Sequence, residues 1–234
     1  MLGDAMFQYI FKRYEKKYRL NNEQFNTILN AIKPFTVADK YGKTTVNSLY
    51  FDTPQKLLIR TSIEKPVYKE KLRLRCYNQC SENGYTFTEI KKKYKGIVYK
   101  RRIISSYCDA YNYLTDKNDV IPPSQIKSEI DYFKKRYSNL QPSMCIFYDR
   151  LAFYDKNDMN VRITFDTNIL YRDYDLDLTK GAYGNKILPD DSYIMEIKTL
   201  GAMPLWLSNI LDKNKIYPTS FSKYGNAYLK TLNF

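Results

Sequence analysis

The feature that most constrains this chain is a run of alternating charged and apolar residues, Lys71-Leu72-Arg73-Leu74-Arg75-Cys76-Tyr77. Successive side chains of a β-strand point to opposite faces, so this alternation predicts a strand with one cationic face and one apolar face. The cationic face carries Lys71, Arg73 and Arg75. Three adjacent cations repel one another unless an anion lies between them. The run therefore predicts either a solvated basic face or a face that binds an anionic group.

Charge and composition narrow the choice of partner. The 234 residues include 38 lysines and arginines against 25 acidic residues, a formal net charge of +13, and no histidine. This excess predicts a polyanionic partner, which could be nucleic acid, an anionic membrane or a phosphate compound. Histidine is the commonest general base and metal ligand. Without it, a metal would be held by carboxylates and substrate oxygens, which favours magnesium or manganese over zinc.

The cysteines and the apolar segments indicate the compartment. None of the four cysteines (Cys76, Cys80, Cys108 and Cys145) forms a C-x-x-C pair, and the first residues lack a basic segment followed by an apolar run. No apolar stretch approaches the ~20 residues of a transmembrane helix. We therefore expect a soluble, cytoplasmic protein with reduced thiols.

Periodicity and turn residues give the remaining elements. Strands are expected at 11–20, 44–51, 67–77, 85–93, 97–104, 144–154, 159–166 and 192–199. Helices are expected from Asn22 up to Pro34, at 105–116 and 124–139, from Pro204, and from Ser222 onward. Residues 172–189 are expected to be a mobile loop. With no internal repeat and no linker, we expect a single domain over residues 1–234.

The other strands repeat the charged-face pattern. Their charged faces carry Glu15 and Lys17; Glu89, Lys91 and Lys93; Lys100 and Arg102; Arg150; Arg162 and Asp166; and Glu196 and Lys198. In one arrangement these faces point to water around a sandwich core. In the other the sheet closes into a barrel with the charged faces inside and helices covering the apolar outside. Charges of both signs are normally mixed on surfaces, so the cation excess favours the second. The predicted fold class is α+β, an antiparallel β-barrel with a charged interior and helices packed outside.

Such a tunnel would suit phosphate chemistry. Arginine forks bind phosphate oxygens bidentately, and lysines add point charges. Glu196, placed among cations, could hold a divalent ion that bridges phosphates, or it could be a structural ion-pair partner. Phosphoryl transfer needs mainly alignment and charge neutralisation, so it requires neither histidine nor a protein nucleophile.

These segments together resemble the VTC domain, the polyphosphate polymerase module of the vacuolar transporter chaperone complex, within the CYTH or triphosphate tunnel superfamily. The matching segments, in family order, are YEKKY at 14–18, SLYFDT at 48–53, KLRLR at 71–75, EIK at 89–91, KRR at 100–102, DRLAF at 149–153, VRITFD at 161–166, MEIK at 195–198 and FSKY at 221–224. Each segment is weak alone, but the ordered set covers nearly the whole chain.

The resemblance implies a basic tunnel in which the γ-phosphoryl group of ATP passes to the end of a polyphosphate chain, with release of ADP and help from Mn²⁺ or Mg²⁺. Residues carried over as phosphate contacts are Lys17, Arg73, Arg75, Lys91, Lys100, Arg150, Arg162, Lys198 and Lys223. Among these, Lys17, Arg73, Arg75, Lys198 and Lys223 are the expected catalytic residues. Glu196 would hold the metal, while Glu15 and Glu89 would be secondary metal ligands or lysine-orienting groups.

One departure and three alternatives remain open. The eukaryotic enzyme has a lysine where this chain has Ser220, and coupling to membrane export would need a separate membrane partner. The same tunnel could hydrolyse triphosphate or a nucleoside triphosphate, or it could bind polyphosphate without catalysis. A nucleic-acid binder is disfavoured by the carboxylates among the cations and by the lack of a nucleic-acid-binding motif.

Overall fold

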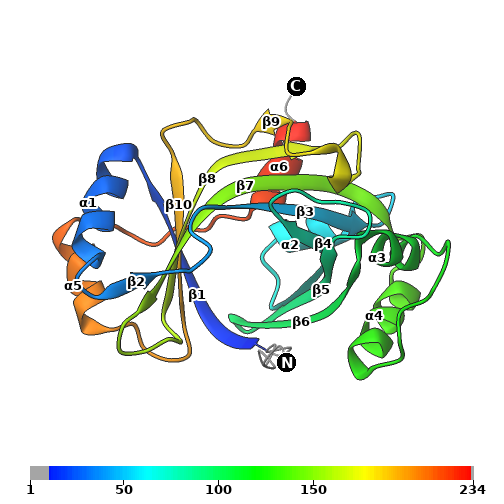
Figure 1. Cartoon of the computed structure of the whole chain (residues 1–234), viewed down its shortest axis with the longest axis horizontal. Helices are drawn as coiled ribbons and strands as arrows, with labels where there is room; N and C mark the ends of the chain where they lie inside the picture. Colours follow the sequence, from blue (N-terminus) through cyan, green and yellow to red (C-terminus); the bar gives the residue numbers. More distant parts are fainter. Residues whose placement is uncertain (1–10, 233–234) are drawn as a thin grey trace.

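The structure, a computed structural model, describes residues 11–232, and a closed ring of antiparallel strands lies at its centre (Figure 1). Around the ring, each strand pairs with the next in the order β3 (Thr44–Asp52), β4 (Tyr68–Tyr77), β5 (Tyr85–Tyr94), β6 (Ile97–Ser106), β1 (Phe11–Leu20), β10 (Tyr193–Thr199), β8 (Arg162–Arg172), β7 (Gln141–Asp155) and again β3. Two short strands, β2 (Thr36–Ala38) and β9 (Asn185–Lys186), add to β7 and β8. The predicted antiparallel barrel is confirmed.

Strand alternation directs the charged faces inward and the apolar faces outward. Leu72 and Leu74 of β4 are fully buried on the outer face, beneath α3 (Tyr107–Leu114) and α4 (Gln125–Arg136). Burial of a leucine side chain contributes roughly 1.5–3 kcal/mol, so this outer layer stabilises the wall that carries the cations.

A second apolar layer covers the opposite side of the barrel (Figure 1). There α1 (Asn22–Ile32) and α5 (Leu205–Lys213) pack Ile28 and Leu207 against Met195 and Ile197 of β10. The start of α1 follows from its sequence, because Asn21 and Gln24 form a reciprocal capping box with bonds of 2.8 and 3.1 Å. The prediction of helices over an apolar exterior is thus confirmed. None of the helices within residues 11–232 has the length and apolar character needed to cross a membrane.

Two helices pack at one end of the barrel, α2 (Leu57–Ile63) and α6 (Lys223–Leu232). Asp52, at the end of β3, joins them. Its carboxylate accepts the backbone N–H groups of Leu58 and Ile59 at 2.9 and 3.0 Å and the hydroxyl of Tyr224 at 2.9 Å. Helix α2 was not predicted from the sequence, because its capping carboxylate is not the residue at the helix start, Lys56, which has a φ of 58°.

Further differences from prediction lie after residue 140. Both β7 and β8 are longer than expected, and β8 continues to Arg172 past an irregularity in its pairing with β7. The expected mobile loop at 172–189 contains a 3₁₀ turn, Leu178–Lys180, and β9. Fully buried Arg172 donates to four backbone carbonyls in this segment, those of Asp175, Asp177, Gly181 and Tyr183. Carbonyl partners leave no sequence signal, so this order could not be read from side-chain types.

Two other helices are shorter than predicted, and serine caps explain both starts. The side chain of Ser106 accepts the N–H of Asp109 at 3.1 Å, and that of Ser124 accepts the N–H of Lys127 at 3.1 Å. Ser106 is also the last residue of β6, so the chain turns from strand to helix at the cap. The predicted helix types are correct, and their ends move inward by a few residues.

Candidate functional site

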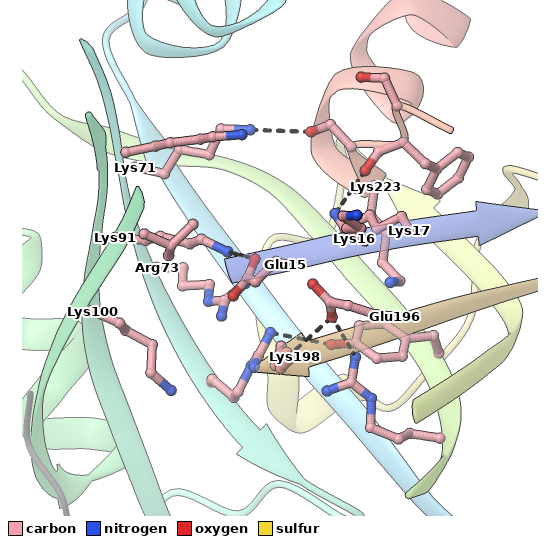
Figure 2. Close-up of a pocket in the computed structure, with 18 of the residues that line it drawn as sticks. Glu15, Lys16, Lys17, Lys71, Arg73, Lys91, Lys100, Glu196, Lys198 and Lys223 are labelled. Carbon is pink, nitrogen blue, oxygen red and sulfur yellow. Dashed lines mark hydrogen bonds and ion pairs between the residues drawn. The ribbon is translucent and has the colours of Figure 1, made fainter. Parts of the chain in front are cut away.

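A cavity of about 760 Å³ lies inside the barrel, and cations dominate its lining (Figure 2). Its basic lining residues are Lys16, Lys17, Lys69, Lys71, Arg73, Arg75, Lys91, Lys93, Lys100, Arg102, Arg150, Arg162, Lys198 and Lys223. Its lining carboxylates are Glu15 and Glu196. Residues 218–223, just before and at the start of α6, complete the wall. A partly enclosed space with such a lining concentrates anions.

The structure brings together all but one of the predicted site residues. All nine predicted phosphate contacts line the cavity: Lys17, Arg73, Arg75, Lys91, Lys100, Arg150, Arg162, Lys198 and Lys223. Of the three predicted acidic residues, Glu15 and Glu196 line it and Glu89 does not. Residues far apart in the sequence meet here because β1 pairs with β10 and because the backbone N–H of Thr219 donates to the carbonyl of Lys17.

Glu89 lies in the wall beneath the cations and is fully buried. Its Oε2 accepts Nε and Nη2 of Arg73 at 2.9 and 2.8 Å, and its Oε1 accepts Nζ of Lys100 at 3.0 Å. Arg75 lies 3.9 Å away. Burial alone would raise the pKa of Glu89, but Arg73, Arg75 and Lys100 hold it well below its ordinary value. Of its two predicted roles, this geometry favours orienting the cations over binding a metal.

Asp166 plays the same part on the opposite wall, although it was not predicted as a site residue. Its carboxylate accepts Nε and Nη2 of Arg150 at 2.6 and 2.8 Å, and it also binds Nζ of Lys223. Burial would raise the pKa of Asp166, but Arg150 and Lys223 lower it to about 2. The sequence did hold a signal for this role, because Asp166 alternates with Thr164 and Arg162 along β8 and therefore lies on the same inward face as Arg162. Asp166 therefore fixes one arginine and one lysine from different elements.

Two tyrosines separate the cations, and both were missed as site residues. The Tyr50 hydroxyl accepts Nη1 of Arg73 at 2.8 Å, and the Tyr148 hydroxyl accepts Nη2 of Arg75 at 3.2 Å. The Tyr148 ring also lies 4.3 Å from Nζ of Lys223, within cation–π range. These contacts reduce the repulsion between neighbouring cations.

Glu15 and Glu196 supply the oxygen ligands that a divalent metal would need. They project into the cavity from paired strands, with Glu15 opposite Lys198 and Glu196 opposite Lys17 (Figure 2). Glu196 Oε2 is 3.2 Å from Nζ of Lys198. Burial would raise the pKa of Glu196, but Lys198 and Lys17 hold it well below its ordinary value, so the carboxylate is ionised.

Over residues 11–232, no group of three or more histidine, cysteine or acidic side chains is arranged to hold a metal. Carboxylate oxygens suit Mg²⁺ or Mn²⁺, and Mg²⁺ is commonly held by one or two carboxylates together with substrate phosphates. The residues present fit such a shared site, with Glu196 as the main protein ligand and Glu15 beside it.

The lining also predicts a pH dependence. Burial and nearby lysines lower the pKa of Lys71 to about 7, although Tyr50 acts to raise it. Lys71 is therefore cationic below pH 7 and largely neutral above it. We expect the affinity for a long polyphosphate to fall between pH 6 and pH 8 in the wild type, and to fall less in Lys71→Met. Titration calorimetry at both pH values would measure this.

The terminal phosphate of the ligand itself ionises near pH 6. Because this ionisation is the same in both experiments, it cancels when the pH slope of the affinity is compared between the wild type and Lys71→Met. The titration of Tyr50 does not reverse the expected fall in affinity with rising pH. Burial would raise its pKa, but Arg73, Lys71 and Arg75 lower it to about 7, so it adds negative charge as the pH rises. Equal pH slopes in wild type and Lys71→Met would show that Lys71 does not titrate in this range.

Solved structures with the same fold were found at low sequence identity. One from Bacillus halodurans, described as a candidate adenylate cyclase, has a TM-score of 0.59 and 13% identity, covering 92% of this chain and 96% of that one. One from Hippeastrum, described as a candidate adenylyl cyclase with a dominant triphosphatase activity, has a TM-score of 0.50 and 17% identity, covering 95% and 97%. These likenesses show that the chain shares the fold of those structures. No curated protein sequence matches this chain.

The sequence itself matches one protein family, the VTC domain, over residues 12–232. The match includes every strand of the barrel and all of the cavity-lining residues. The chain therefore belongs to the VTC domain family.

Proposed function

We propose that this chain is a metal-dependent polyphosphate polymerase that transfers the γ-phosphoryl group of ATP to the end of a polyphosphate chain in the barrel cavity. The observation that carries the proposal is the cavity lining, in which Glu196 stands among lysines and arginines in a VTC-family barrel. The partners implied are ATP and inorganic polyphosphate, with Mn²⁺ or Mg²⁺ as cofactor and no nucleic acid.

The step needs alignment and charge neutralisation. An ionised oxygen of the terminal phosphate attacks the γ-phosphorus, the bond to the β–γ bridging oxygen breaks, and its electron pair leaves with ADP. The attacking oxygen carries no proton, so no general base is required, in keeping with a chain without histidine. Arg73, Arg75 and Lys198 would neutralise charge on the transferred group, while Lys17 and Lys223 hold the phosphates in line. A divalent ion held by Glu196 would offset further charge on phosphate oxygens.

Two other outcomes use the same cavity. If water replaces the phosphate chain as acceptor, the product is orthophosphate, and the Hippeastrum protein of the same fold is described as having triphosphatase activity. If the cavity only holds its ligand, the protein is a polyphosphate binder. The cation-rich lining serves all three, so the product of the reaction decides among them.

The test is to incubate the purified protein with ATP and Mn²⁺ and to resolve the products on a gel stained for polyphosphate. We expect a polyphosphate ladder together with ADP, and loss of the ladder in Glu196→Gln and in Arg73→Ala. Glu129→Gln is the control, because Glu129 pairs with Lys92 and Arg101 on the outside of the barrel. Orthophosphate without a ladder would indicate a hydrolase, and tight polyphosphate binding without either product would indicate a binder.

A further inference from the structure

Two cysteines lie in contact on the outer side of the barrel wall. Cys76 is the last outward-facing residue of β4, and Cys80 follows in the loop that leads to β5. Both side chains belong to the apolar layer between the barrel and α3 and α4, where Cys76 is 2% exposed and Cys80 is 7% exposed. Their free thiols hydrogen-bond to each other. Neither cysteine lines the cavity, so the proposed function makes no use of this contact.

A tight turn holds the two cysteines together. Asn78 lies between them with a φ of 57°, in the left-handed region that asparagine tolerates better than most residues. Its backbone N–H donates to the carbonyl of Thr45 at 2.7 Å, and its Oδ1 accepts the N–H of Thr45 at 3.2 Å. Asn47, which is opposite Cys76 on β3, donates from Nδ2 to the carbonyl of Asn78 at 2.6 Å and to Sγ of Cys76 at 3.7 Å. Strand β3 therefore fixes both the turn and the position of Cys76.

The two thiols differ in acidity. The hydrogen bond with Cys76 lowers the pKa of Cys80; burial acts to raise this pKa, and Thr86 lowers it further. The same hydrogen bond raises the pKa of Cys76, and burial raises it more. The thiolate, and not the thiol, is the nucleophile in cysteine chemistry. Cys80 is therefore the sulfur that reacts first with an oxidant, and it is also the more exposed of the two.

The loop that carries Cys80 allows the two sulfurs to approach. A disulfide requires that they move from hydrogen-bonding distance to bonding distance. Cys76 is held by β4 and by Asn47, whereas Cys80 lies in residues 78–84, whose backbone belongs to neither a strand nor a helix. A small shift of this loop toward β4 brings the sulfurs together without a change in the pairing of the strands.

We propose that Cys76 and Cys80 form a reversible disulfide on the outer wall of the barrel, with a peroxide as the oxidant. The Cys80 thiolate attacks one oxygen of hydrogen peroxide, the O–O bond breaks, and hydroxide leaves, which gives a sulfenic acid on Cys80. The Cys76 sulfur then attacks the Cys80 sulfur, and the S–S bond forms as the hydroxyl group and the Cys76 proton leave as water. The two sulfurs lose two electrons in all, which reduce the peroxide to water. A dithiol restores both thiols by exchange.

Mass spectrometry of the full chain tests this proposal. Trypsin cleaves after Arg75 and after Lys91, so Cys76 and Cys80 fall in one peptide, residues 76–91, which contains no third cysteine. The protein is treated with hydrogen peroxide, unfolded in N-ethylmaleimide to label the remaining thiols, and digested. We expect this peptide to lose two hydrogens and to carry no maleimide. Dithiothreitol added before the label should restore two maleimide groups.

Three variants test the order of reaction. After peroxide, Cys76→Ser should stop at a sulfenic acid on Cys80 that dimedone traps, whereas Cys80→Ser should keep a free thiol on Cys76. Cys108→Ser is the matched control, because Cys108 is exposed on α3 and lies outside the pair, and it should form the disulfide at the wild-type rate.

The wild-type result does not depend on the folding of any variant. A peptide 76–91 that keeps two maleimide groups under conditions that fully oxidise Cys108 would overturn the proposal. Oxidation of this peptide to sulfinic acid without a disulfide would overturn it too, because the Cys76 thiol would then not reach Cys80.

Discussion

Replacement of Glu89 by glutamine is expected to lower the free energy of unfolding by about 3–5 kcal/mol, because one partner of a buried ion-pair group is removed. Arg73 and Lys100 would keep their positive charges inside the wall with no carboxylate to accept their hydrogen bonds. Glutamine has nearly the same shape, so the loss reports charge and hydrogen bonding and not a cavity. The effect applies near neutral pH, because a carboxyl with a lowered pKa stabilises the fold above its ordinary value of 4.5 and loses that contribution as the pH falls.

Urea unfolding would measure this change, with an unchanged slope showing that the same surface is exposed on unfolding. The matched control is Glu129→Gln, whose pairs with Arg101 and Lys92 are partly exposed on the outer face. That substitution should lower stability by about 1 kcal/mol or less. The Glu89 variant should also bind tripolyphosphate more tightly than the wild type, since the cavity gains net positive charge. A variant that is as stable as the wild type would show that Glu89 does not neutralise the cations.

Replacement of Arg73 by lysine is expected to lower the turnover of the proposed polymerase by about 100-fold, the usual effect of removing one aligned donor from a reacting group. The guanidinium binds Glu89 through Nε and Nη2 and Tyr50 through Nη1, which holds it in one orientation. An ammonium group is a point charge without this planar fork, so it cannot keep both contacts and also address a phosphate in the same plane. We expect the Arg73→Lys variant to fold, because the positive charge beside Glu89 is kept.

Steady-state measurement of ADP release would separate kcat from KM for this variant. A fall mainly in kcat indicates that Arg73 acts on the transferred group, whereas a rise only in KM indicates uniform binding of ATP. Arg101→Lys is the control, because Arg101 neighbours Arg102 on β6 but pairs with Glu129 on the outside. Turnover within twofold of the wild type in Arg73→Lys would remove Arg73 from the catalytic residues.

The sequence predicted the wall of the site better than its interior contacts. Strict alternation in β4 is enough to place Arg73 and Arg75 on one face, and the cation excess is enough to favour a closed barrel over a sandwich. Alternation does not say which residue lies across the barrel. The bond from Asp166 to Lys223 joins positions 57 residues apart, and the contact of Tyr148 with Arg75 depends on the register of β3 against both neighbours. Roles that depend on register therefore had to come from the structure.

The same limit explains the missed helix and the misread loop. The cap of α2 is a carboxylate at the end of β3, and the order of residues 173–184 depends on one buried arginine bound to backbone oxygens. Neither arrangement has a local composition signal. In contrast, the groups that cap the start of α1 lie within four residues of one another, and the helix was predicted at the correct place.

The closure of the ring has a consequence for how the protein folds. One edge of β1 pairs with β10, so the barrel closes only when residues near the start of the chain meet residues 193–199. Pairings of such large sequence separation form late, because the entropy of a long loop must be lost first. During synthesis the strands β4, β5 and β6 can pair as hairpins, each with its cationic face exposed, long before β10 leaves the ribosome. The nascent chain therefore carries an open, positively charged sheet, and only the last strands convert that sheet into an enclosed site.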